Sequence, residues 1–228
     1  MSKKLMLLAA GVLSALAVAA LPAIASAQEY EVHCPTGVCT GSITGLASEH
    51  AIELENDAKE KVSAAEVKGN IEISKSTTTT ATVSLEFREV RETISGFKFK
   101  CNTAGAESGV IKTGPLVGHF VNLTTGGTNP GILLTNINVT FTCAGGLSTK
   151  TVTGNIIGTI TEPNCNKPTT TNKVTFNIKS GTPGTQEHLL YTGTAFDLIS
   201  GPHANDTTTS AQTGHGNVKW NQDVELTC

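Results

Sequence analysis

The chain has 228 residues, of which 15% are charged and 4% aromatic, and its formal net charge at pH 7 is −3. This composition excludes a coiled coil, which needs about half Ala, Glu, Lys, Leu and Arg, and a collagen, which needs a strict glycine period. The negative charge argues against a polybasic nucleic-acid-binding protein, so we expect no nucleic acid partner.

Residues 1–27 have the pattern of a secretory signal peptide. Two lysines at positions 3 and 4 precede an apolar stretch from Leu5 to Leu21, and Ala25-Ser26-Ala27 follows as an A-x-A cleavage site. We therefore predict a mature chain of residues 28–228 that is secreted or extracytoplasmic and associated with the cell surface. We expect no membrane insertion after signal cleavage.

The mature chain alternates apolar and polar residues, which is typical of half-buried antiparallel strands. The alternating sets are Val83, Leu85 and Phe87; Phe97, Phe99 and Cys101; Leu133, Ile137, Val139, Phe141 and Cys143; Val152, Ile156 and Ile160; Val174, Phe176 and Ile178; and Val218, Trp220, Val224, Leu226 and Cys228. The pattern predicts an all-β fold, an antiparallel β-sandwich stapled by disulfides. We expect one domain over residues 28–228, with a domain boundary near residue 105, where the charge density falls, as the alternative.

One segment departs from the strand pattern. Ala58, Val62 and Ala65 recur at helical spacing, and Asp57 with Glu60 has the spacing of a capping box. This favours a short helix near residues 57–66, and a strand through Val62 is the alternative.

Six cysteines lie in the predicted mature chain: Cys34, Cys39, Cys101, Cys143, Cys165 and Cys228. An even number of cysteines in an exported chain predicts disulfides. Three of them end strands in phase with the apolar residues. We favour the pairs Cys34–Cys39, Cys101–Cys143 and Cys165–Cys228, and the other pairings stay open.

Four stretches resemble a group of uncharacterised exported β-rich proteins of soil bacteria. They are the segments at 97–105 (FKFKCNTAG), 113–119 (TGPLVGH), 139–143 (VTFTC) and 152–160 (VTGNIIGTI). The resemblance covers about the last two thirds of the mature chain and implies export and β structure. These proteins have no assigned activity, so the resemblance implies no functional site.

Three groups of polar residues are candidates for a functional site. His203, Asn205 and Asp206, with His215, offer transition-metal ligands but follow Gly201-Pro202 in an expected exposed loop. Glu53, Glu55 and Asp57 offer oxygen ligands for calcium, although the solvated face of a strand explains them as well. Glu162, Glu187 and Asp197 are the isolated acids that a glycosidase would need as a pair, and Trp220 and Tyr191 are the few candidates for stacking on a sugar.

These observations predict a secreted or cell-surface binding or structural module with an unknown extracellular ligand or a cell-envelope component as its partner. We expect no catalytic site, no cofactor and no metal, and whether a metal binds near His203 and Asp206 stays open. The alternatives are a secreted polysaccharide-acting hydrolase and a metal-dependent adhesive module.

Overall fold

The structure is a computed structural model that describes residues 29–124, 128–161, 165–187, 198–201 and 208–227. The described residues form antiparallel strands and one 3-10 turn, which confirms the predicted all-β class. The elements are β1 (Glu31–His33), β2 (Cys39–Leu46), β3 (Ile52–Asn56), β4 (Lys61–Ala64), β5 (Glu66–Ile73), β6 (Thr77–Thr78), β7 (Thr80–Arg88), β8 (Arg91–Ile94), β9 (Phe97–Thr103), β10 (Ile111–Lys112), β11 (Leu116–Asn122), β12 (Pro130–Cys143), η1 (Ala144–Gly146), β13 (Ser148–Thr161), β14 (Thr169–Phe176), β15 (Leu198–Gly201) and β16 (Thr209–Thr227).

The strands belong to one sheet that closes on itself. The pairing runs β16–β2–β5–β7–β11–β12–β13–β14 and returns from β14 to β16. The two layers expected of a sandwich are therefore joined by hydrogen-bonded strands. In this circuit β2, β5 and β7, which precede residue 105, are neighbours, and they pair at their two ends with β16 and β11, which follow it.

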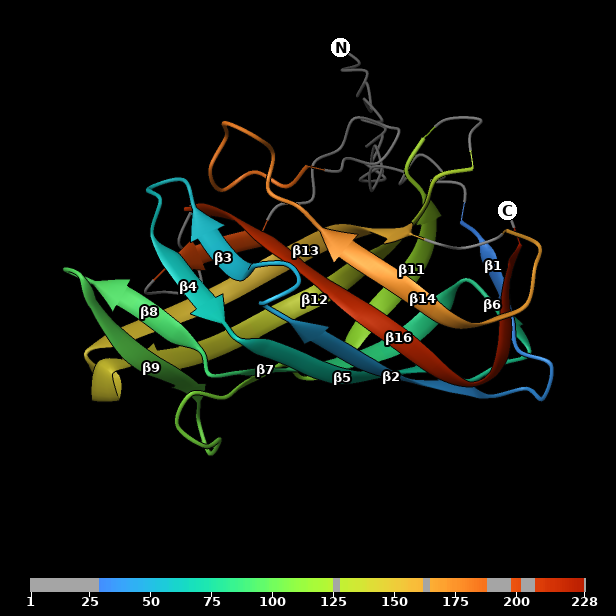
Figure 1. The fold of residues 1–228 in the computed structure, drawn as a ribbon, viewed down its shortest axis with the longest axis horizontal. Coiled ribbons are helices and arrows are strands. Elements are labelled where there is room, and N and C mark those ends of the chain that lie inside the picture. The colour runs from blue at the N-terminus through green and yellow to red at the C-terminus, as the bar shows by residue number, and fades with distance from the viewer. Residues whose placement is uncertain (1–28, 125–127, 162–164, 188–197, 202–207, 228) are drawn as a thin grey trace, which may run out of the picture.

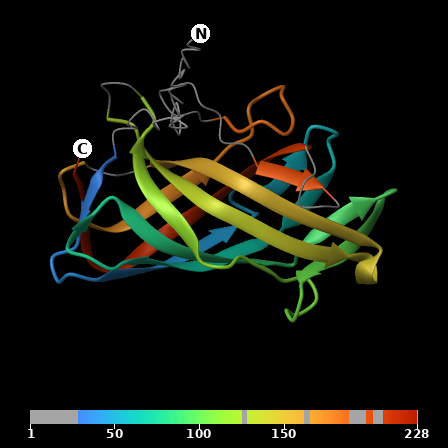
Figure 2. The ribbon, with the colours of Figure 1, turned by 180° about the vertical axis from the view of Figure 1, so that it is seen from behind.

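A second circuit continues the first along the molecule. The long strands β12, β13 and β16 change partners part of the way along, and there they pair with β9, β15 and β3. Strands β4 and β8 complete this second circuit between β3 and β9. The result is the elongated shape that Figures 1 and 2 show from opposite sides. Closure matters because it pairs strand edges that would otherwise be open.

The side chains that point inward form one large apolar core. Alternate residues of β2 are buried, as are Val218, Trp220, Val224 and Leu226 of β16, as the alternation predicts. Ile156 and Ile160 of β13 belong to the same core. The sheet therefore encloses an apolar interior lined from many strands.

The structure corrects the predicted helix near residues 57–66. Strand β3 ends at Asn56 and β4 begins at Lys61, so Val62 lies in a strand. The Asn56 side chain closes the turn between them: its Oδ1 accepts a hydrogen bond from the Glu60 backbone N–H at 2.8 Å, and its Nδ2 donates one to Glu60 Oε2 at 2.9 Å. These bonds satisfy the polar groups that a helical cap would have used.

Two strand faces also differ from the expected ones. The pairing of β12 with β13 shifts register between Leu134 and Ile137, so Leu133 leaves the face of Val139 and packs in a separate cluster with Val121, Leu123 and Ile157. Phe97 is 69% exposed, because it begins β9 next to the tight turn from β8. Alternation alone cannot detect a bulge or the end of the core.

The disulfides agree with the predicted pairing where the structure describes both partners. Cys34 is bonded to Cys39 and Cys101 to Cys143. Cys165 is also disulfide-bonded, and its predicted partner Cys228 lies outside the described residues. Disulfides of this kind indicate an oxidising, extracytoplasmic environment.

Candidate functional site

Three neighbouring cavities lie inside the closed sheet, with volumes of about 100, 60 and 30 Å³. The first and second share Leu85, Leu134 and Phe176 in their walls, and the second and third share Ile132 and Val218. The first and third have no lining residue in common, so the cavities form a row. We call them the apolar row.

The walls of the apolar row are mainly aliphatic and aromatic, with a few polar residues such as Gln212 between the first two cavities and Lys167 at the third. Val62 and Ala64 of β4 face Val139, Phe141 and Val152 of β12 and β13 across the first cavity. Trp220 of β16 lines the third cavity. Its Nε1 donates a hydrogen bond to Asn172 Oδ1 at 2.7 Å, so the polar end of this indole is satisfied and the ring serves as core, as its strand phase predicts.

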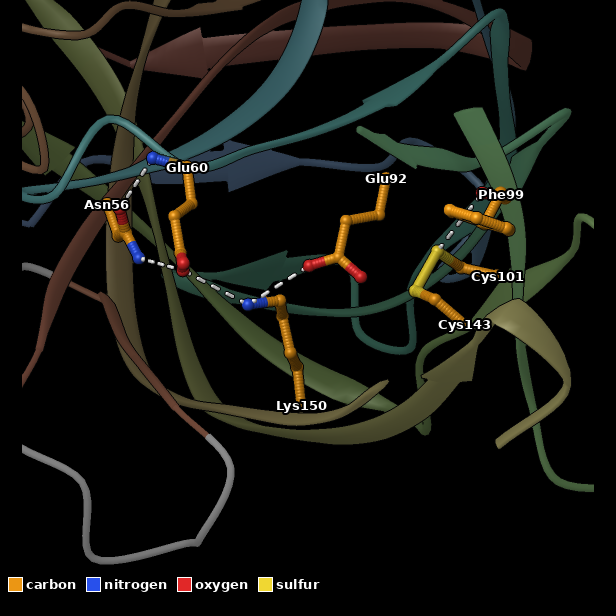
Figure 3. A network of polar contacts seen from close by, with 7 residues as sticks. All are labelled: Asn56, Glu60, Glu92, Phe99, Cys101, Cys143 and Lys150. Carbon is orange, nitrogen blue, oxygen red and sulfur yellow. Dashed lines mark hydrogen bonds and ion pairs between the residues drawn. A yellow bond between two sulfur atoms is a disulfide. The ribbon is translucent and has the colours of Figure 1, made fainter. Parts of the chain in front are cut away.

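A group of charged side chains lies beside the first cavity. Glu92 of β8 is paired across the sheet with Val62, and Lys150 of β13 with Phe141, so both charged residues share the face of cavity-lining residues. Lys150 Nζ lies 3.1 Å from Glu92 Oε1 and 3.2 Å from Glu60 Oε2. Figure 3 shows this network, which we call the polar corner: Asn56, Glu60, Glu92 and Lys150.

Burial of both partners distinguishes the Glu92–Lys150 pair from the other ion pairs in the described part of the chain. The side chain of Glu92 is 6% exposed and that of Lys150 is 15% exposed, whereas Lys61 in its pair with Glu53 is 47% exposed. A buried charge without a partner is costly, so each member of the Glu92–Lys150 pair depends on the other.

The neighbouring charges set the ionisation of this group. Burial alone would lower the pKa of Lys150, but the hydrogen bonds and charges of Glu92 and Glu60 outweigh burial and raise it. The hydrogen bond from Asn56, followed by the contact with Lys150, lowers the pKa of Glu60. Both shifts favour the charged forms of Lys150 and Glu60.

The polar corner adjoins the Cys101–Cys143 disulfide. Cys101 of β9 and Cys143 of β12 lie directly opposite each other, with Cα atoms 4.0 Å apart and both residues fully buried. In Figure 3 the Glu92 carboxylate lies between Lys150 and this disulfide. The sequence analysis did not identify Glu92 or Lys150, because the sequence does not show whether a charged residue in a strand is buried or exposed to solvent.

Of the residues weighed for a transition metal, only His215 is described, and it is buried. Its Nε2 lies 2.8 Å from Glu49 Oε2, and its ring meets that of His50 edge to face at 5.9 Å between centroids. His203, Asn205 and Asp206 lie outside the described residues. The metal site considered there therefore stays untested.

The acids weighed for calcium or for glycoside hydrolysis have other surroundings. Lys61 lies between Glu53 and Glu55, with its Nζ 3.0 and 3.7 Å from their carboxylates, so a cation of the chain already offsets part of their negative charge. The hydrogen bond from Lys61 to Glu53 raises the pKa of Lys61. Glu187 is exposed, whereas Glu162, Tyr191 and Asp197 lie outside the described residues.

Comparisons with known proteins found no family model, no curated protein and no solved structure that matches this chain. In the part of the chain that the structure describes, no helix has the length and apolar character needed to cross a membrane.

Proposed function

We propose that the chain is exported after removal of residues 1–27 and acts outside the cytoplasm, at the cell surface, as a binding protein for a small apolar ligand. The observation that carries this proposal is the apolar row within the closed sheet. Binding sites for small molecules are concave, mostly apolar and enclosed by rigid elements, and the row has these properties.

The linear arrangement of the cavities favours an unbranched aliphatic chain over a compact ring system. Neighbouring cavities share walls of Leu, Ile, Val and Phe side chains, which adopt other rotamers at modest cost. An apolar cavity of about 150 Å³ binds a molecule of the size of benzene. Each cavity of the row is smaller than this, so a ligand must displace the side chains that separate them. An aliphatic ligand that enters the row replaces empty space with van der Waals contacts.

The proposal is tested by calorimetric titration of the exported protein with straight-chain alkan-1-ols of increasing length. We expect the affinity to rise by about 0.8 kcal/mol per methylene until the row is full, and then to stop rising. An affinity that does not depend on chain length, or no binding at any length, would contradict the proposal.

A cavity-filling variant locates the binding. Ala64→Leu adds volume to the wall of the first cavity, and Val152→Phe does so from the opposite wall. Thr93→Leu adds similar volume at an exposed position of β8 and is the control. We expect the first two variants to weaken alkanol binding at unchanged sheet content, and Thr93→Leu to bind as the unmodified protein does.

A further inference from the structure

Three potential metal ligands from three strands meet beside the polar corner. Glu92 of β8, Cys101 of β9 and Cys143 of β12 place a carboxylate oxygen and two sulfur atoms within 4.8 Å of one another. All three residues are buried, with exposed fractions of 4%, 0% and 0%. Within the described part of the chain, no other group of three such side chains is this close.

One atom of this group lacks a partner. Glu92 Oε1 is held by Lys150, but the buried Oε2 has no hydrogen-bond partner among the described residues. Buried carboxylate oxygens are almost always satisfied, because an unmet acceptor in an apolar interior costs free energy. In Figure 3 the free oxygen lies on the side of the disulfide, whose sulfur atoms carry no hydrogen to donate.

We propose that reduction of the Cys101–Cys143 disulfide creates a binding site for a thiophilic divalent cation such as Zn²⁺, with Cys101, Cys143 and the free oxygen of Glu92 as ligands. Two thiolates and a carboxylate suit zinc, which takes sulfur and oxygen ligands in tetrahedral sites. The sheet holds the two cysteines directly opposite each other, so the ligands are gathered before the metal arrives.

The charges around this site also balance. Among the buried groups, two thiolates and the Glu92 carboxylate carry three negative charges, which a divalent cation and the Lys150 ammonium together neutralise. Glu60, the other partner of Lys150, is 60% exposed, so solvent screens its charge. Lys150 contacts Oε1 and so leaves Oε2 for the metal. An interior of low polarity tolerates charges only when they are paired in this way.

The chemical steps require a two-electron reductant, which is a low-molecular-weight thiol in the proposed reaction and a phosphine in the test below. Two such thiols reduce the disulfide: the Cys101–Cys143 S–S bond breaks, each cysteine sulfur gains one electron and one proton, and the reductant becomes a disulfide. Zinc binding then forms two Zn–S bonds and releases both cysteine protons. Exchange with a low-molecular-weight disulfide reverses the sequence: the Cys101–Cys143 bond forms again, the oxidant is reduced to two thiols, and the zinc ion is released. The site is therefore gated by redox state.

The test measures zinc bound per chain by equilibrium dialysis, with the exported protein in its oxidised form and after anaerobic reduction by a phosphine. We expect the reduced protein to hold one zinc ion that the oxidised protein lacks. Cys34→Ser/Cys39→Ser retains this ion, Cys101→Ser/Cys143→Ser loses it, and Glu92→Gln binds it at least about tenfold more weakly. Loss in Cys34→Ser/Cys39→Ser alone, or no effect of Glu92→Gln, overturns the proposal.

Folding is followed in the same samples by far-ultraviolet circular dichroism during heating. Because the site exists only in the folded sheet, zinc must raise the melting temperature of the reduced protein and leave that of the oxidised protein unchanged. If reduction unfolds the protein, zinc must restore the sheet in the unmodified sequence and fail to do so in Cys101→Ser/Cys143→Ser. Zinc uptake by an unfolded chain without such recovery also overturns the proposal.

Discussion

The apolar row and the polar corner are neighbouring parts of one interior, and alternating strands build both. They differ in how much each side chain depends on a particular partner. The row is held by aliphatic and aromatic side chains that need no particular partner. The polar corner puts Glu92 and Lys150 at equivalent inward positions, where each depends on the other. The row can therefore tolerate exchange of its contents, whereas the corner is specific to its residues.

The largest expected loss of stability comes from removing one charge of the polar corner. Lys150→Met leaves Glu92 buried without its cation, and we expect a loss of about 3–5 kcal/mol in unfolding free energy at pH 7. Lys61→Met removes the cation of an exposed pair and costs less than about 1 kcal/mol. Urea unfolding of both variants measures the difference.

The double variant Lys150→Met/Glu92→Leu sharpens this result. Replacing both charges by apolar groups removes the uncompensated carboxylate, so we expect the double variant to be more stable than Lys150→Met alone. Equal losses for Lys150→Met and Lys61→Met would show that the polar corner is no different from a surface ion pair.

The next largest effect is expected where β2 pairs with β16 and so closes the sheet around the apolar row. A Cβ added at Gly45 of β2 would overlap the carbonyl oxygen of His215 in β16, whereas one added at Gly114 meets nothing within 4 Å. We expect Gly45→Ala to lose about 1–3 kcal/mol of unfolding free energy, and Gly114→Ala to stay within about 0.5 kcal/mol of the unmodified protein. Thermal unfolding of the two variants decides; equal melting temperatures would contradict the close approach of β2 and β16.

A smaller effect is expected at the far end of the row. Trp220→Phe keeps an aromatic ring in the third cavity but removes the hydrogen bond to Asn172, so we expect a loss of about 1–2 kcal/mol in unfolding free energy. Asn172→Ala removes the acceptor instead. A double-mutant cycle with no coupling between the two sites would show that this hydrogen bond contributes nothing.

The smallest expected effect concerns pH. The pKa of Glu60 is lowered in the folded state by Asn56 and Lys150, so its contribution to stability is present above the unfolded-state pKa of about 4.3 and is lost as pH falls through the folded value. Because the Glu60 side chain is 60% exposed, solvent screens the effect. Glu60→Gln should slightly lower the unfolding free energy at pH 8 and flatten its decline below pH 5, so that the variant and the unmodified protein converge at low pH. A decline as steep as that of the unmodified protein would contradict this contribution.

The sequence predicts the class of fold because alternation is a local property. In β16 every apolar residue of the predicted face from Val218 to Leu226 is buried, and Cys101 and Cys143 end their strands in phase and pair. The helix near residues 57–66 was wrong because three small apolar residues at helical spacing also fit a strand, a turn and a strand. The side chain of Asn56 decides between these structures, and its contacts are not visible in periodicity.

The candidate site could not be predicted from the sequence, because it depends on which strands are neighbours in the sheet. Nothing in the sequence around Glu92 distinguishes it from the exposed acids, and its partner Lys150 lies on a distant strand. The closure of the sheet likewise rests on pairings of β16 with β2 and β14, from both ends of the chain. Long-range register of this kind is set by packing of the whole molecule.

The central claim, that the apolar row holds the ligand, is tested most directly by a crystal structure of the exported protein with its best-bound alkanol. The account predicts continuous electron density for the aliphatic chain between Phe141 and Trp220, with the separating side chains in new rotamers. A chain bound on the outer face of the sheet, with the row unchanged, would contradict it.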